Sequence, residues 1–189
     1  MRRIKEFSWI VLPIIVIVFC ILAYQIVEPV GAEENPYNIP QAVVDSAERW
    51  GKAYGISPEF LEAVAWAEGR YNPNAINKSG TCHGLMQISL SAHSERMARL
   101  GVTSLYDLDG NMAVAADYFA ELFEEYEDAA LVLMLYHGEG DAQWKYDNGK
   151  MSSYASGILE MSYELETLHG KHSRAKFDPE TVDWENGVG

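Results

Sequence analysis

The sequence is poor in cysteine, in metal-ligand motifs and in basic residues. Its two cysteines are Cys20 and Cys82, and Cys20 lies in an apolar N-terminal run, so no disulfide framework is expected. The five histidines form no HExxH motif and no CxxC spacing occurs, so we expect neither a metal nor another cofactor. The formal net charge is −14, which lacks the basic face that phosphate binding requires and argues against a nucleic-acid partner.

Strict strand alternation and internal repeats are also missing. The chain has 189 residues, of which 48% are hydrophobic, and its apolar residues recur at helical spacing. These patterns predict an all-α domain of about six to eight helices. We expect Gly55 to end the first helix, Ser57 to cap the second and Asp109 to cap a later one. The expected helices cover about residues 43–54, 58–68, 85–101, 111–127, 129–137 and 151–168, and residues 69–84 form a long, ordered loop.

The N-terminus has the pattern of an export signal. Arg2, Arg3 and Lys5 precede an apolar run from Trp9 to Val27, close to the ~20 residues that span a bilayer. Basic residues ahead of the run place the rest of the chain outside the cytoplasm. Two interpretations remain open: an uncleaved membrane anchor, or a signal peptide removed after the small residues that end at position 32.

These features divide the chain into four parts. Residues 1–32 form the anchor or signal peptide, and the polar segment 33–40, with two prolines, is a linker. Residues 41–168 form the helical domain, and residues 169–189 form a polar, flexible tail. The domain is therefore expected at the outer face of the cell membrane, or secreted after signal cleavage.

One residue breaks an apolar stripe. Leu61, Val64 and Ala65 follow the spacing of one helix face, and Glu68 occupies the next position on that face. A carboxyl group at the mouth of a core has a raised pKa, because desolvation disfavours the anion. Such a group can donate a proton to a leaving oxygen, as glycoside cleavage requires. From the spacing alone, a helix-ending glutamate that turns to solvent is the favoured interpretation of the pattern.

Four segments in order add to this pattern. They are EGRYNPNA from Glu68, GLMQ from Gly84, LYHGEG from Leu135, and a tyrosine on the last helix, Tyr154. Their order and spacing resemble those of the soluble lytic transglycosylase (SLT) family, whose fold is the lysozyme-like α-domain. The resemblance covers roughly residues 56–165.

The resemblance implies an enzyme that cleaves peptidoglycan glycan strands. Glu68 would protonate the oxygen between MurNAc and GlcNAc, then take a proton from the MurNAc C6 hydroxyl, which attacks C1. The product would be a 1,6-anhydro sugar. Substrate-binding roles are implied for Met86, Gln87, Tyr136, His137 and Tyr154, with Tyr154 touching the catalytic carboxyl and no metal involved.

Two departures from the family pattern keep other functions open. Gly69 replaces the usual serine and His137 the usual asparagine. A hydrolytic muramidase would need a second carboxylate or a well-held water opposite Glu68. Candidates for the carboxylate are, only by default, Glu95, Asp107 and Asp109, each more typical of a cap or a solvated charge. A non-catalytic glycan-binding module of a phage, conjugation or secretion apparatus is a further alternative. Membership of a larger envelope machine rests on analogy.

Overall fold

The computed structural model describes residues 36–171. The expected anchor or signal peptide, the start of the linker and the tail beyond Lys171 therefore lie outside the described residues. Between residues 36 and 171, no helix has the length and apolar character needed to cross a membrane. Residues 38–171 belong to one compact unit.

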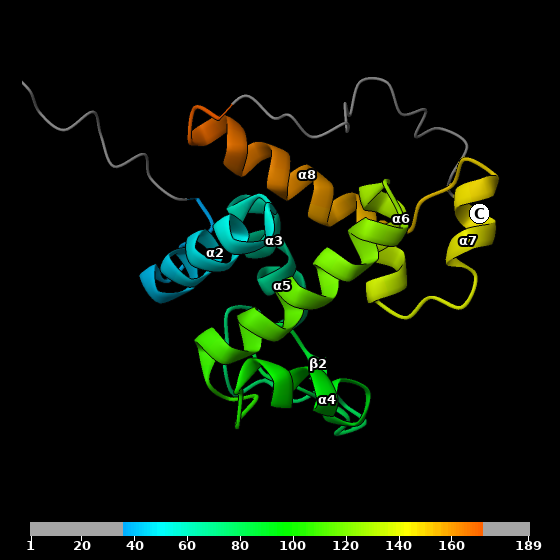
Figure 1. Ribbon diagram of the computed structural model, residues 1–189. Coiled ribbons are helices and arrows are strands. Elements are labelled where there is room, and N and C mark those ends of the chain that lie inside the picture. The colour runs from blue at the N-terminus through cyan, green and yellow to red at the C-terminus, as the bar shows by residue number, and fades with distance from the viewer. Residues whose placement is uncertain (1–35, 172–189) are drawn as a thin grey trace, which may run out of the picture. The chain divides into compact units, whose positions relative to one another are not determined.

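The described residues form seven helices and one short hairpin, which confirms the predicted helical class (Figure 1). The helices are α2 (Gln41–Tyr54), α3 (Pro58–Gly69), α4 (Leu90–Leu100), α5 (Leu108–Glu125), α6 (Ala129–Tyr136), α7 (Ala142–Asp147) and α8 (Ser153–Leu168). The hairpin consists of β1 (Cys82–His83) and β2 (Ile88–Ser89), which pair antiparallel with Cys82 opposite Ser89.

Helix α3 lies between α2 and α8 and supplies much of the core. Its residues Leu61, Ala63, Val64 and Ala65 have no exposed surface. Helix α5 packs on α2 and α6, and α6 packs on α8. Figure 1 shows α8 at one end of this arrangement and the hairpin with α4 at the other. Burial of these apolar faces supplies the main favourable term in folding. The C-terminal end of α3 lies between α8 and the hairpin (Figure 1).

The prediction of a helix over residues 85–101 is wrong in its first part. Helix α4 begins at Leu90, while residues 85–87 form a turn and Ile88 enters the hairpin. Gly84 and Gln87 have φ angles of 80° and 50°, which belong to the left-handed region and interrupt a helix. Leu85, Met86 and Ile88 are buried, so their apolar spacing reflects contacts with the core and not a helix face.

Two predicted caps also differ from the structure. Asp107, not Asp109, caps α5: its carboxylate accepts a hydrogen bond from Gly110 N at 2.8 Å. Asp109 instead accepts hydrogen bonds from Ser46 and Trp50 and so joins α5 to α2. Ser57 precedes α3 as expected, but its hydroxyl donates to carboxylates and accepts no hydrogen bond from the backbone N–H groups of the helix. Helix α7 has no counterpart among the predicted helices.

A buried group of carboxylates lies where the start of α3 meets the end of α8. Glu59 and Glu62 on α3 are each 1% exposed, and Glu166 on α8 is 7% exposed. Ser57 Oγ donates to both Glu59 and Glu166, and His169 Nδ1 and Lys171 Nζ lie 2.7 Å and 2.5 Å from Glu59 Oε1. The contacts of this unit therefore continue past Leu168 to Lys171.

The pKa values of the two α3 carboxyl groups, Glu59 and Glu62, are shifted in opposite directions. Burial raises the pKa of Glu59, but hydrogen bonds from Lys171 and His169 outweigh it and lower that pKa to about 2. Burial, followed by the negative charge of Glu59, raises the pKa of Glu62 to about 7. The Oε2 atom of Glu62 has no hydrogen-bond partner that would favour its anion.

We expect Glu62→Gln to stabilise the protein above neutral pH. The unfolded chain loses the Glu62 proton near pH 4.5 and the folded protein near pH 7, so stability falls as pH rises through this window. The gap corresponds to at most about 3 kcal/mol, and uncharged glutamine removes the loss. Urea unfolding from pH 4 to 8.5 measures the pH dependence of the free energy of unfolding, with Glu160→Gln on the exposed face of α8 as the control. Parallel curves for wild type and Glu62→Gln would contradict the prediction.

Candidate active site

Glu68 occupies the last turn of α3, at the end of its buried stripe. Leu61, Val64 and Ala65 are fully buried, while the Glu68 side chain is 14% exposed. The helix ends at Gly69, and Arg70 and Tyr71 follow with φ angles of 51° and 58°. The carboxyl group therefore lies at the edge of the core, where it is largely but not wholly removed from water.

Tyr154 holds one oxygen of this carboxyl group. Its hydroxyl donates a hydrogen bond to Glu68 Oε1 at 2.5 Å. Ser152 caps α8 by accepting from Ala155 N, which places Tyr154 in the first turn of that helix. Burial, and then the charge of Glu68, raises the pKa of Tyr154 well above its ordinary value. Tyr154 consequently remains a protonated donor throughout the pH range in which a carboxyl group titrates.

His137 lies against the same pair. It is the first residue after α6, and its ring stacks on Tyr154 with centroids 3.9 Å apart and planes at 20°. His137 Nδ1 is 3.7 Å from Glu68 Oε1, within ion-pair distance but beyond a good hydrogen bond. The His137 side chain is 46% exposed, so it can exchange a proton with solvent.

Burial dominates the acidity of Glu68. Desolvation raises the pKa of Glu68, while the hydrogen bond from Tyr154 and the nearby His137 lower it, and the net result is a raised pKa. A carboxyl group with a raised pKa keeps a larger protonated fraction near neutral pH, as a general acid requires. Its second oxygen, Oε2, is the one that Tyr154 leaves available for a transferable proton.

The turn at residues 84–87 is held by a buried amide that the sequence analysis did not identify. Asn111 on α5 has no exposed surface, and its Oδ1 accepts from Met86 N at 2.7 Å. Its Nδ2 donates to His83 O at 3.0 Å and to Leu105 O at 2.9 Å. The signal in the sequence is a lone amide ahead of the apolar run MAVAA, which is typical of a polar group that needs buried partners.

Two residues expected to bind substrate have different surroundings in the structure. Met86 was expected to line the floor of a cleft, but its side chain has no exposed surface and packs in the core. The Met86 carbonyl instead accepts a hydrogen bond from the Tyr136 hydroxyl at 2.8 Å. The Tyr136 ring stacks on Phe119, with centroids 4.1 Å apart. Tyr136 therefore ties α6 to the turn, and burial followed by the charge of Glu68 raises its pKa.

Gln87 completes this turn and is only partly buried. Its Nε2 donates to Gly84 O at 2.9 Å, and its own φ angle is 50°. A positive φ angle is costly for a residue with a side chain, and such residues concentrate at functional sites. Strained backbone therefore occurs just beyond Glu68, at Arg70 and Tyr71, and directly after the buried Met86, at Gln87.

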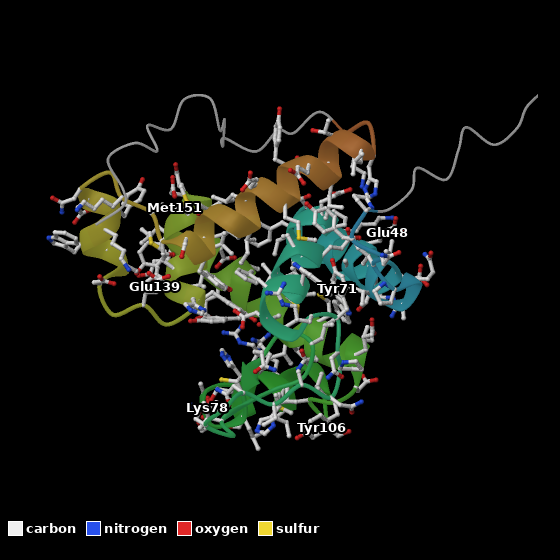
Figure 2. The ribbon with its side chains drawn as sticks, turned by 180° about the vertical axis from the view of Figure 1, so that it is seen from behind. Glu48, Tyr71, Lys78, Tyr106, Glu139 and Met151 are labelled. Atoms are coloured by element: carbon white, nitrogen blue, oxygen red, sulfur yellow. The ribbon has the colours of Figure 1, made fainter. Side chains whose placement is uncertain are left out.

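Gly69 has a structural explanation. A Cβ atom added to Gly69 would lie 2.3 Å from Leu85 O, so the end of α3 touches the backbone of the turn. The serine usual in the family does not fit here unless that backbone moves. Gly84 is equally confined, because a Cβ atom would lie 2.1 Å from Leu105 O. The end of α3, which carries Glu68, and the turn at residues 84–87, which carries Gln87, are therefore in direct backbone contact. Figure 2 labels Tyr71, which follows the end of α3.

Comparisons with known proteins agree with this geometry. Residues 45–156 match the family model described as the transglycosylase SLT domain. The chain is 29% identical over 126 residues to the X polypeptide of Escherichia coli strain K12, covering 64% of this chain and 73% of that protein. It is 26% identical over 124 residues to the endo-type membrane-bound lytic murein transglycosylase A of Klebsiella pneumoniae, covering 62% of this chain and 61% of that protein.

A solved structure has the same fold. The X-ray structure of an inactive Glu-to-Gln mutant of the lytic transglycosylase Slt from Pseudomonas aeruginosa superposes with a TM-score of 0.59 at 18% identity. The match covers 74% of this chain and 25% of that one. The lysozyme-like helical fold expected from the resemblance is therefore shown for the described residues.

Proposed function

The chain belongs to the transglycosylase SLT domain family and is a lytic transglycosylase, and from this premise we propose that it cleaves the β-1,4 bond between MurNAc and GlcNAc in peptidoglycan and forms 1,6-anhydroMurNAc. Glu68 is the general acid and then the base. The observation that carries the proposal is a carboxyl group whose pKa is raised by burial and whose Oε1 is held by Tyr154.

The first step transfers a proton from Glu68 to the glycosidic oxygen. The bond from MurNAc C1 to that oxygen breaks, GlcNAc leaves with the proton, and positive charge develops at C1. Oε1 accepts the hydrogen bond from Tyr154, so the transferred proton is assigned to Oε2. Tyr154 keeps its own proton and stabilises the carboxylate that remains, because a hydrogen bond to a charged group is stronger than one to a neutral group.

The second step closes the anhydro ring. The C6 hydroxyl of MurNAc attacks C1 and gives its proton to the Glu68 carboxylate. One bond breaks, one bond forms and Glu68 regains its proton, so no water is consumed. This sequence needs one carboxylate. It suits a chain in which Asp107 caps a helix, Asp109 joins two helices, and Glu95 lies exposed on α4.

A hydrolytic muramidase is the second candidate, and one observation favours it. The negative charge of Glu139 contributes to the raised pKa of Tyr154, so a second carboxylate acts on the Glu68–Tyr154 pair. The Glu139 side chain is 12% exposed, and Lys145 Nζ lies 2.7 Å from its Oε2. Because this ion pair engages one oxygen of the Glu139 carboxyl group, a base that activates water would have to use the other oxygen.

Substrate contacts remain part of the proposal. We assign Gln87 and His137, which retain exposed surface, to direct contact with the glycan. An amide such as that of Gln87 both donates and accepts, which suits an N-acetyl group. Tyr136 and Met86 act indirectly, because the Tyr136 hydroxyl and the Met86 carbonyl bind each other.

The location of the enzyme is proposed from the N-terminal sequence. We propose that residues 1–32 either anchor the chain in the cell membrane or are removed on secretion, with residues 41–168 forming the catalytic domain outside the cytoplasm. The name of the Klebsiella pneumoniae relative, which describes a membrane-bound enzyme, supports this. A role in a larger envelope machine stays an analogy.

The product of digestion tests the reaction. Purified peptidoglycan treated with the full chain is expected to yield muropeptides with anhydro ends, each lighter by one water than a reducing end. Mass spectrometry separates the two. Reducing ends alone would replace the proposed reaction by hydrolysis. Binding without cleavage, with folded protein verified by circular dichroism, would favour the non-catalytic glycan-binding module.

A further inference from the structure

We propose that His137 is a positioning residue that sets the upper pH limit of the reaction, because its cationic ring holds Glu68 in the carboxylate form that cannot donate a proton. The inference rests on the role proposed for Glu68 as general acid. It concerns a position where this chain departs from the family pattern, since asparagine is usual there and has no charge to contribute.

The geometry leaves the His137 ring little freedom. The ring stacks on Tyr154, with centroids 3.9 Å apart and planes at 20°, while the hydroxyl of the same tyrosine binds Glu68 Oε1. His137 Nδ1 lies 3.7 Å from that oxygen. One carboxyl oxygen thus faces a neutral donor and an imidazole that the stack holds in position.

Several elements near Glu68 and His137 carry charged or titratable side chains. Tyr154 on α8 is a donor whose pKa is raised, and Tyr136 at the end of α6 is another tyrosine whose pKa Glu68 raises. Glu139, in the turn after α6, is paired with Lys145 of α7, and Arg70 beyond α3 lies over the Trp66 ring. Among residues 36–171, Tyr154 and His137 are the side chains that lower the pKa of Glu68. Of these two, His137 is the one whose side chain can carry a positive charge.

The consequence follows from how the pair shares one proton. The proton can lie on Glu68, with His137 neutral, or on His137, with Glu68 ionised. These two arrangements have the same net charge, but only the first can donate to a glycosidic oxygen. A cation 3.7 Å from the carboxylate favours the second. An uncharged residue at position 137 removes that competitor, so burial alone then opposes the hydrogen bond from Tyr154 and Glu68 keeps its proton to higher pH.

The test is the pH dependence of kcat/KM for glycan cleavage, measured with the full chain in wild type, His137→Asn and His137→Phe. Loss of the glycan contact proposed for His137 lowers the whole profile, so the position of its basic limb is compared and not its height. The basic limb is expected to move up by about one pH unit in both variants, which is about a tenfold larger protonated fraction of Glu68 above the wild-type limb. His137→Phe keeps an aromatic ring on Tyr154 and separates charge from stacking. His137→Lys keeps a cation and is expected to hold the limb near its wild-type position.

A second measurement reads the same quantity without activity. The ¹³C chemical shift of the Glu68 carboxyl carbon, followed by NMR against pH, is expected to titrate at higher pH in His137→Asn than in wild type. A merely structural role for His137 lowers kcat/KM at every pH in His137→Asn, spares His137→Phe, and moves neither the limb nor the titration. That result would overturn the inference.

Failure of this inference is distinguishable from failure of the proposed function. Cleavage that persists in Glu68→Gln removes Glu68 from the reaction, and the proposed function fails with everything built on it. Cleavage that is lost in Glu68→Gln, together with an unmoved basic limb in His137→Asn and His137→Phe, retains Glu68 as the acid and rejects His137 alone.

Discussion

Glu68→Gln is expected to lower the rate of glycan cleavage by about 10³-fold or more while leaving the protein folded. General acid–base catalysis contributes about 10²–10⁴-fold, and here one side chain serves as both acid and base. Glutamine has nearly the same shape, and its amide oxygen can still accept the hydrogen bond from Tyr154. It has no ionisable proton to transfer. Muropeptide release, followed by mass spectrometry over time, measures the loss.

Two controls accompany this variant. Glu160→Gln, on the exposed surface of α8, is expected to cleave at the wild-type rate. The thermal midpoint of Glu68→Gln is expected to equal or exceed that of wild type, because the largely buried carboxyl group costs less when it cannot ionise. A folded Glu68→Gln protein that retains activity within tenfold of wild type would contradict the assignment.

Asn111→Leu is expected to reduce the free energy of unfolding by about 4 kcal/mol. Leucine has the same branched shape, with methyl groups in place of the amide oxygen and nitrogen, so most of the loss comes from the three backbone groups that Asn111 now satisfies, one each from His83, Met86 and Leu105. Each buried group without a partner costs about 1–3 kcal/mol. A domain of this kind has only about 5–15 kcal/mol in total, so the thermal midpoint is expected to fall by about 10 °C.

Urea unfolding monitored by circular dichroism measures this change. Asn148→Ala, which removes one exposed hydrogen bond to Trp144 O, is the matched control and is expected to stay within about 0.5 kcal/mol of wild type. An Asn111→Leu protein as stable as Asn148→Ala would mean that the turn at residues 84–87 is held by other contacts. Because Tyr136 binds the same turn, cleavage is also expected to fall in Asn111→Leu.

Much of the fold was predictable because its helices follow local rules. The stripe of Leu61, Val64 and Ala65 is buried as its spacing indicates, and Gly55 ends α2 in the left-handed conformation expected of a glycine cap. The stop of α6 before Gly138, which has a φ angle of 79°, follows from the same chemistry, whereas α3 is capped by Arg70, a residue with a side chain and a positive φ angle.

The errors arose where distant residues decide the local structure. Residues 85–89 have apolar spacing compatible with a helix, yet Asn111 and the positive φ angles of Gly84 and Gln87 shape them into a turn. Helix α7 is too short to show a period. Glu62 has the spacing of an ordinary helix acid, and only the packing of α8 against α3 shows that it is buried.

The acidic residue of the candidate site was predictable from the sequence, whereas the surroundings of the residues around it were less so. Glu68 stood out because it breaks an apolar stripe, and Tyr154 was expected beside it from the resemblance. The structure brings these two together and places His137, also expected in the site from the resemblance, beside them. Met86 was expected to bind substrate from its place in the motif, with core packing as the alternative, and the structure shows its side chain fully buried and its backbone bound by Asn111 of α5 and Tyr136 of α6.

The close approach of Gly69 to Leu85 couples two parts of the chain that are often treated as independent modules. Replacing Gly69 by the common serine adds one hydroxyl and also displaces the turn at residues 84–87. The two segments must therefore be exchanged together, as a matched pair taken from one donor protein.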